Sequence, residues 1–174
     1  MTLRVVLTGP EASGKTTLAR TLADALAAPC VPEASRLVAE ALRPEGLSAE
    51  TVAPIAQLGM RLDDEARLRE PDVIVYDTDL VSTVVYARHY YGEVASWIVD
   101  EARARRADLY LLCRPDLPWT PDGVRDRPTG REAMFDAFRD ALTELGARVV
   151  EIGGVGEART EAARAAVEAA RAGK

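Results

Sequence analysis

The sequence LRVVLTGPEASGKTTLA, from Leu3 to Ala19, decides how the rest of the chain is interpreted. Its first part is a short apolar run, and its centre, GPEASGKT, fills the pattern G-x-x-x-x-G-K-[ST]. A buried strand before this pattern and a helix after it are the context in which the pattern binds phosphate, and both are expected here. We therefore predict a phosphate-binding loop (P-loop) between a strand and a helix; the alternative is a glycine-rich turn that only caps the helix.

Each position in the loop has an expected part in binding a triphosphate. Gly9 and Gly14 allow the tight turn that points backbone N–H groups inward, and the start of the helix adds its positive end. Lys15 is expected to reach the outer phosphates, and the Thr16 hydroxyl to hold Mg²⁺. Lys15 and Lys174 are the only lysines in a chain that otherwise uses arginine, which indicates a need for a slim ammonium group in the loop. The residues expected to bind ATP are Gly9, Glu11, Ala12, Ser13, Gly14, Lys15, Thr16 and Thr17.

Length and composition limit the classes of protein to consider. The chain has 174 residues, which predicts a single domain over 1–174. It carries 22 basic and 28 acidic residues without a basic stripe, which argues against nucleic acid or an anionic membrane as the main partner. Cys30, Cys113 and one histidine support neither a zinc site nor a disulfide framework. No leader and no long apolar run is evident, so a cytoplasmic location is expected.

Apolar runs alternate with segments of helical periodicity along the whole chain. This alternation predicts an α/β fold of the P-loop NTPase class: three layers, with an open, mostly parallel five-stranded sheet and helices on both faces. The stretch 114–131 is rich in proline, glycine and arginine and is interpreted as a lid loop. The helix expected at the carboxyl end is assigned no function. Strands are expected at 3–8, 30–32, 72–77, 109–113 and 148–152, and helices at 17–28, 37–42, 48–69, 80–91, 94–105, 132–145 and 157–172.

Polar residues that follow the strands are the candidates for chemistry, because ligands of such sheets lie outside the carboxyl ends of the strands. Asp77 ends an apolar strand and is expected to hold Mg²⁺ together with Thr16, unless it is an ordinary polar strand end. Glu33 is favoured as the general base, with Asp79 next. Glu33 has an alternative role as a carboxylate that stabilises a helix N-terminus.

Three arginines of the 114–131 loop are expected to close over the triphosphate. Arg125 and Arg127 are assigned to offset charge on the transferring phosphate, and Arg131 to contact the nucleotide. The alternative is that they are surface arginines paired with neighbouring acids. The loop 153–156 is a reasonable site for adenine.

Five segments together carry a resemblance to a known family: GPEASGKTTLA, VPEASR, VIVYDTDLVSTVVYARHYYG, LYLLCRPDLPWTPDGVRDRP and VVEIGG. In this order they resemble the nicotinamide riboside kinase (ribosylnicotinamide kinase) domain of NadR-type proteins and the related AAA-labelled ATPases. The resemblance covers roughly 150 residues. It implies a nucleoside-kinase-like sheet and ATP-dependent phosphorylation of the 5′-hydroxyl of nicotinamide riboside to nicotinamide mononucleotide, in NAD biosynthesis. It also implies that Glu33 and Asp79 lie near the acceptor, and that Arg125 and Arg127 belong to the lid.

The expected function is therefore an ATP- and Mg²⁺-dependent kinase acting on a small, nucleoside-like acceptor, with homo-oligomer formation left open. One alternative is an ATP-binding regulatory switch that acts on a partner protein. A GTPase switch is disfavoured, because the chain has no asparagine and so no N-K-x-D motif for guanine. A non-catalytic ligand-binding module is a third alternative, which requires that loss of the Lys15 side chain leave function intact.

Overall fold

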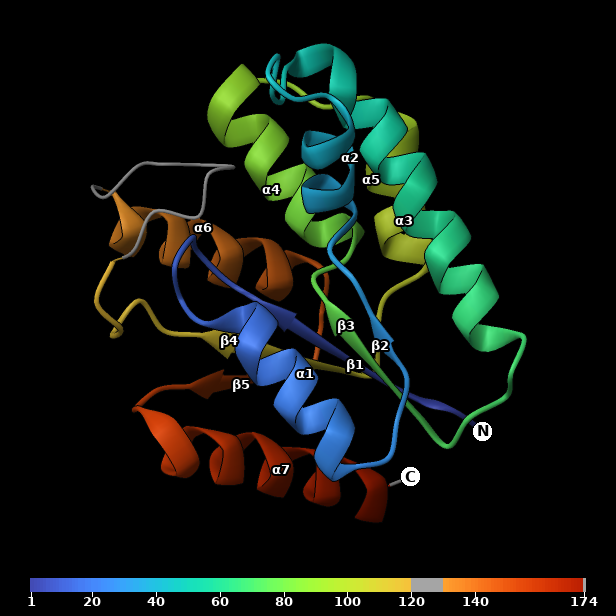
Figure 1. The fold of residues 1–174 in the computed structure, drawn as a ribbon, viewed down its shortest axis with the longest axis vertical. Coiled ribbons are helices and arrows are strands. Elements are labelled where there is room, and N and C mark those ends of the chain that lie inside the picture. The colour runs from blue at the N-terminus through green and yellow to red at the C-terminus, as the bar shows by residue number, and fades with distance from the viewer. Residues whose placement is uncertain (120–129, 174) are drawn as a thin grey trace.

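The computed structural model describes residues 1–119 and 130–173 (Figure 1). Over these residues five strands form one sheet in the order β2-β3-β1-β4-β5, and every neighbouring pair is parallel. The α/β fold with a five-stranded parallel sheet is therefore confirmed. The strands are β1 (Leu3–Thr8), β2 (Cys30–Val31), β3 (Val73–Asp77), β4 (Leu109–Cys113) and β5 (Val149–Ile152). The helices are α1 (Lys15–Ala25), α2 (Ala34–Ala41), the 3₁₀ helix η1 (Ala49–Thr51), α3 (Val52–Arg67), α4 (Leu80–Tyr91), α5 (Ser96–Ala104), α6 (Arg131–Glu144) and α7 (Gly156–Ala172).

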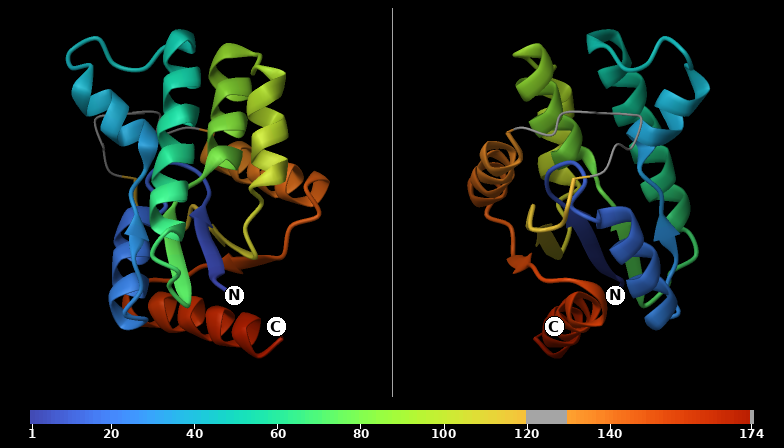
Figure 2. Two further views of the ribbon diagram at one scale, coloured as in Figure 1. Left: turned by 90° about the vertical axis from the view of Figure 1, so that its right-hand side faces the viewer. Right: turned by 60° about the vertical axis from the view of Figure 1, so that its left-hand side comes forward.

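The sheet is buried on both faces, as its continuous apolar strands require. Leu7 and other alternate residues of β1 pack with α1 and α7, whereas Val6 points to the opposite face, where it packs with residues of α3, α4, α5 and α6. Figures 1 and 2 show these two groups of helices on either side of the sheet. The two faces form two separate apolar clusters, so the helices on both faces predicted from the sequence are confirmed.

Three helices begin where a specific residue makes the backbone turn. Gly14 has φ +75° and ends the P-loop directly before α1. Asp79 caps α4, because its side chain accepts a hydrogen bond from the backbone N–H of Val81. Gly130 has φ +88° before α6, which therefore begins at Arg131, the residue expected to end the lid loop.

Some element ends differ from expectation by a few residues. The helix after β2 begins at Ala34, three residues earlier than expected, and this places Glu33 at its N-cap position. The long helix expected to begin at Ser48 is divided into η1 and α3, with a capping box formed by Ser48 and Thr51. Over the described ranges 1–119 and 130–173, no helix is both long enough and apolar enough to cross a membrane.

Candidate active site

The loop between β1 and α1 has the backbone of a tight phosphate-binding turn. Gly9 has φ +131°, and a Cβ atom there would lie 2.7 Å from the carbonyl oxygen of Cys113 on the neighbouring strand. Gly14 has φ +75° and packs against Leu117, whose Cδ1 would be 2.7 Å from an added Cβ. Gly9 is therefore required by the backbone of β4, whereas glycine at position 14 is favoured by its positive φ, since the end of the Leu117 side chain can move.

Lys15 and Ser13 both lie against the loop. The Lys15 ammonium donates to the carbonyl oxygen of Pro10 at 2.6 Å, and the Ser13 hydroxyl donates to the same oxygen at 2.7 Å. Lys15 is only 8% exposed, so its charge is held close to the turn. A pocket opens above the loop, and a phosphate bound there would meet this charge and the N-terminus of α1 together. The pocket is lined by Glu11, Ala12, Ser13, Gly14, Lys15, Thr16, Thr17, Glu33, Arg36, Tyr86, Leu117 and Pro118.

Asp77 lies at the buried end of β3, beside this pocket. Burial raises the pKa of Asp77, a hydrogen bond from Thr16 lowers it, and the nearby Glu33 raises it, with a net upward shift. Its Oδ1 atom is buried and has no hydrogen-bond partner among the described residues. A buried carboxylate oxygen without a donor, next to a threonine hydroxyl, has the hard oxygen chemistry that Mg²⁺ prefers, so the residues present fit this ion.

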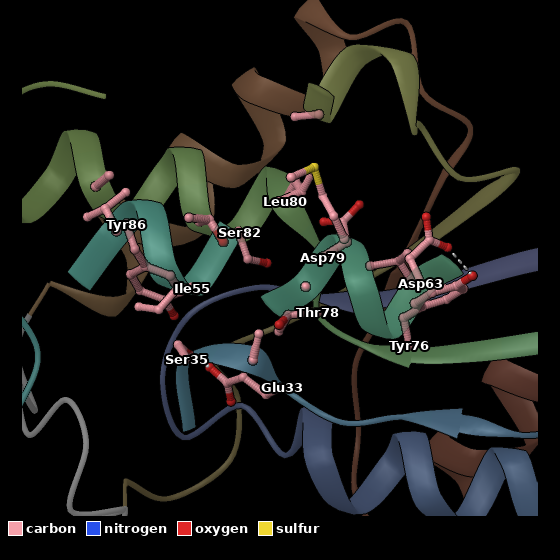
Figure 3. A pocket seen from close by; sticks show the side chains of 18 of the residues that line it. Glu33, Ser35, Ile55, Asp63, Tyr76, Thr78, Asp79, Leu80, Ser82 and Tyr86 are labelled. Carbon is pink, nitrogen blue, oxygen red and sulfur yellow. Dashed lines mark hydrogen bonds between the residues drawn. The ribbon is translucent and has the colours of Figure 1, made fainter. Parts of the chain in front are cut away.

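A second pocket lies beside the P-loop pocket, on the far side of Glu33 from the loop (Figure 3). Its walls come from β1, β3, α2, α3, α4 and α5, and most of them are apolar. Figure 3 shows Glu33 and Ser35 near one end of the group, and Asp63 with Tyr76 near the other. Glu33 and Tyr86 line both pockets, so these two side chains lie at the boundary between them. Further residues of its lining are Val6, Ile55, Gly59, Met60, Asp79, Leu80 and Ser82.

Glu33 holds its carboxylate at this boundary without capping α2. It occupies the N-cap position of that helix but accepts no capping hydrogen bond through its side chain. Instead the Ser35 hydroxyl donates to Oε1 at 2.5 Å, and Arg36 Nε lies 3.8 Å from Oε2. Only 8% of Glu33 is exposed. The sequence also allowed a role for Glu33 as a carboxylate that stabilises the N-terminus of α2. That role explains why Glu33 precedes the helix, but it does not explain why its carboxylate accepts from Ser35 and not from the backbone of the first turn.

Asp79 also lines the second pocket, but both of its carboxylate oxygens are engaged. Oδ1 accepts from the Val81 N–H at 3.0 Å, and Oδ2 accepts from the Tyr110 hydroxyl at 2.8 Å. Burial raises the pKa of Asp79 to about 6, against hydrogen bonds from Tyr110 and from backbone N–H groups that lower it. These contacts fix the start of α4 and the floor of the pocket.

At the far end of the second pocket an ionic cluster surrounds Asp63. The Tyr76 hydroxyl donates to its Oδ1 at 2.7 Å, and Arg67 Nε donates to the same atom at 2.8 Å. Arg105 donates to Oδ2 at 3.0 Å and also contacts Asp64. These bonds join α3, β3 and α5, so they hold the walls of the pocket together at that end.

The arginines expected to act on the triphosphate divide into two groups. Arg125 and Arg127 lie outside the described residues. Arg131 donates to the backbone carbonyl oxygens of Ala12, at 3.4 Å, and Leu117, at 3.0 Å, so it contacts the P-loop from behind.

Two side chains that contact the P-loop were not singled out as site residues from sequence. Tyr90 donates to Glu11, and Tyr86 donates to the Gly9 carbonyl oxygen at 3.3 Å. Their spacing of four residues in α4 is the sequence signal that could have identified them, because it puts both rings on one face of the helix, where they are stacked.

The last helix also contacts the site, contrary to the expectation that it has no part in it. Arg159 of α7 is 4% exposed and donates to the Ser13 carbonyl oxygen at 2.7 Å. Its signal in the sequence is a charged residue in line with the apolar positions Ala163, Val167 and Ala170, which are also buried.

Comparison with known proteins supports the fold that carries this site. The model of a family described as "AAA domain" matches residues 4–159. The chain belongs to that family. Its fold is similar to crystal structures of NadR protein, one in complex with NAD and AMP-PNP (TM-score 0.82) and one in complex with NR (TM-score 0.75), both at 23% identity. It is also similar to thymidylate kinase from Ehrlichia chaffeensis, at TM-score 0.68 and 14% identity.

The similarity to NadR covers 99% of this chain but 50% of the NadR chain, so this chain spans half the length of that protein. The similarity to the thymidylate kinase covers 99% of both chains. No curated protein matches the chain. At these identities the solved structures establish a P-loop kinase-like fold.

Proposed function

We propose that this protein is an ATP-dependent kinase that transfers a phosphoryl group to a hydroxyl of a small, nucleoside-like acceptor. The observation that carries the proposal is the position of Glu33 at the boundary of two adjoining pockets, one above a P-loop and one with mainly apolar walls. Transfer between two small molecules needs such an arrangement, since the phosphate and the acceptor hydroxyl must meet in line.

The residues of the P-loop pocket bind and orient the triphosphate in this proposal. Lys15 and the backbone N–H groups of the loop hold its outer phosphates, and Arg131 supports the loop. Glu33 accepts the proton of the acceptor hydroxyl, which lies in the second pocket within hydrogen-bond reach of the carboxylate. Ser35 and Arg36 orient Glu33. Asp79 is assigned to the pocket floor, because its oxygens already accept bonds from Val81 and Tyr110.

Mg²⁺ is part of the proposal through Thr16 and Asp77. The hydroxyl of Thr16 and the buried Oδ1 of Asp77 are oxygen donors of the kind the ion takes. When bound, the ion would neutralise charge that develops on the phosphates.

Nicotinamide riboside is the acceptor that we propose. Its support is the similarity of the fold to a NadR structure in complex with NR, together with the sequence segments VPEASR and DTD. The apolar walls of the second pocket suit a flat ring, and its polar residues suit a ribose. NAD biosynthesis and a cytoplasmic location follow as parts of this proposal.

A panel of nucleosides that includes nicotinamide riboside tests both parts of the proposal, the kinase reaction and the identity of the acceptor. Consumption of ATP and the mass of the phosphorylated product would be measured for wild type, Glu33→Gln and Glu40→Gln. Glu40 lies on the same helix but is exposed, so it is a matched control. We expect Glu33→Gln to lower kcat by about 10²-fold to 10⁴-fold and Glu40→Gln to leave it unchanged.

The outcomes separate the acceptor from the chemistry. Turnover with a nucleoside other than nicotinamide riboside would overturn the acceptor and keep the kinase. Absence of turnover with every hydroxyl compound, together with nucleotide-dependent capture of a protein, would favour the regulatory switch.

A further inference from the structure

Arg159 is a charged residue on the buried face of an otherwise apolar helix stripe. It lies in the first turns of α7, and the buried residues of that helix that follow it are Ala163, Val167 and Ala170. A guanidinium in such a place is costly unless its N–H groups find acceptors. Both Nη atoms of Arg159 find them, whereas its buried Nε has no hydrogen-bond partner among the described residues, so the contacts of the two Nη atoms indicate why the residue is there.

The contacts of Arg159 join three loops at the carboxyl edge of the sheet. Nη2 donates to the carbonyl oxygen of Ser13 in the P-loop at 2.7 Å. Nη1 donates to Asp116 Oδ1, in the segment after β4, and to the carbonyl oxygen of Gly154, after β5, both at 2.9 Å. The only one of these partners that carries a charge is Asp116.

Asp116 completes the junction from its other oxygen. Its Oδ2 accepts from the Gly154 N–H at 2.7 Å, and a Cβ atom on Gly153 would lie 2.8 Å from that same oxygen. Burial raises the pKa of Asp116, but the Gly154 N–H and the Arg159 guanidinium lower it, with a net downward shift, so the carboxylate stays charged. The absence of a side chain at Gly153 therefore allows the close approach on which the junction depends.

The bond to Ser13 has a direct consequence for the P-loop. The carbonyl of Ser13 and the N–H of Gly14 belong to one planar trans peptide, so they point in opposite directions. A donor that holds the carbonyl outward thereby turns the Gly14 N–H inward, toward the phosphate pocket. Arg131 does the same for the preceding peptide, because it donates to the Ala12 carbonyl.

We propose that Arg159 is a positioning residue that keeps the Gly14 N–H directed into the phosphate pocket by holding the Ser13 carbonyl from behind. The inference rests on the proposed use of this pocket for ATP. It gives the carboxyl-terminal helix a part in nucleotide binding, although Arg159 reaches the P-loop only through its backbone carbonyl.

Calorimetric binding without any acceptor tests this role. Mg²⁺ with AMP-PNP, and separately inorganic tripolyphosphate, would be titrated into wild type, Arg159→Met, Arg159→Lys and Val167→Ala. Val167 is the matched control, since it is buried in the same stripe of α7 and lies two turns further from the P-loop. Thermal melting of each variant measures the loss of stability that does not depend on ligand.

We expect Arg159→Met to weaken binding of both ligands by at least about tenfold, the size expected for a lost bond to a charged donor. Arg159→Lys keeps the charge without the two-armed geometry, so its affinity should lie between those of wild type and Arg159→Met. Val167→Ala should lower the melting temperature and keep both affinities within about twofold of wild type.

Several outcomes would overturn the role. Unchanged affinity in Arg159→Met is one, and equal losses in Val167→Ala at a matched loss of melting temperature are another. A loss confined to AMP-PNP would place the effect at the base and not at the phosphates. If Arg159→Met does not fold, Arg159→Lys against Val167→Ala makes the same comparison. Failure of wild type to bind either ligand would instead overturn the proposed function.

Discussion

Asp77 lies at the end of β3, and its buried Oδ1 has no hydrogen-bond partner among the described residues. If this oxygen binds Mg²⁺, replacing it should change how strongly turnover depends on the ion. In Asp77→Asn the amide oxygen is a weaker ligand, so the Mg²⁺ concentration for half-maximal turnover should rise by about tenfold or more. Affinity for ATP measured without Mg²⁺ should be unchanged, because the loop and Lys15 bind the phosphates. Folding should not suffer, since a buried charge is removed. Weaker ATP binding at an unchanged Mg²⁺ requirement would contradict the assignment.

Asp79 makes the stability of the fold depend on pH. Its pKa is about 6 in the folded chain, raised by burial from 3.8. Between about pH 4 and pH 6 the folded chain therefore binds a proton that the unfolded chain releases, so the free energy of unfolding falls as pH rises through this window. Above about pH 6 this contribution of Asp79 to the free energy of unfolding is completely lost.

Asp79→Asn removes this titration but keeps an oxygen for the Val81 N–H. We therefore compare the free energy of unfolding of the variant with that of wild type. The variant minus wild-type difference should grow with pH between pH 4 and pH 6, by at most about 1.4 kcal/mol per pH unit, and should stay constant above pH 6. Urea denaturation of both proteins across this range measures the difference. A difference that is constant with pH would rule out Asp79 as the titrating group.

At the scale of elements, the P-loop can lie directly against β4 because Gly9 has no side chain. Gly9→Ala would put a Cβ 2.7 Å from a backbone oxygen at φ +131°, so strand and loop must separate. Gly92→Ala is the matched control, with φ +80° and open space around the added atom. We expect the control to cost about 1–2 kcal/mol and Gly9→Ala to cost more and to lose nucleotide binding as well. Equal losses in denaturant melts would show that the contact with β4 is unimportant.

The elements themselves could be predicted from sequence because their signals are local. Apolar runs predicted the strands, and helical periodicity predicted the helices to within a few residues; the structure shows that Gly14, Asp79 and Gly130 set three of the helix starts. The start of α2 was missed because Glu33 is a poor capping residue by type, and its side chain indeed does not cap.

The junction made by Arg159 could not be predicted in this way. Its partners Ser13, Asp116 and Gly154 lie on three other segments of the chain, and only the order of strands in the sheet brings them together. The sequence pattern of α7 is that of a solvated helix with alternating charges, so it did not indicate that Arg159 is buried. Similarly, the sequence located Glu33 after a strand but not its position between two pockets, because the second pocket is lined by residues of β1, β3, α2, α3, α4 and α5 that only the fold brings together.

For the whole molecule, two adjoining pockets at one edge of the sheet predict that two ligands stabilise the fold together. A ligand at 100 times its dissociation constant adds about 2.7 kcal/mol to the free energy of unfolding. AMP-PNP with Mg²⁺ should therefore raise the melting temperature by several degrees, and nicotinamide riboside should raise it further. Lys15→Ala should lose the shift with AMP-PNP and keep the shift with nicotinamide riboside, because Lys15 lines only the P-loop pocket.

The exposed Arg20 of α1 provides the control for this measurement, since Arg20→Ala changes a charge on the same helix outside both pockets. A kinase and a partner-binding switch both predict the shift with AMP-PNP. Only the kinase requires a second shift from a nucleoside, because a switch has no use for a small acceptor beside Glu33. Melting curves that respond to AMP-PNP but to no nucleoside, at concentrations up to the millimolar range, would therefore count against phosphoryl transfer to a nucleoside.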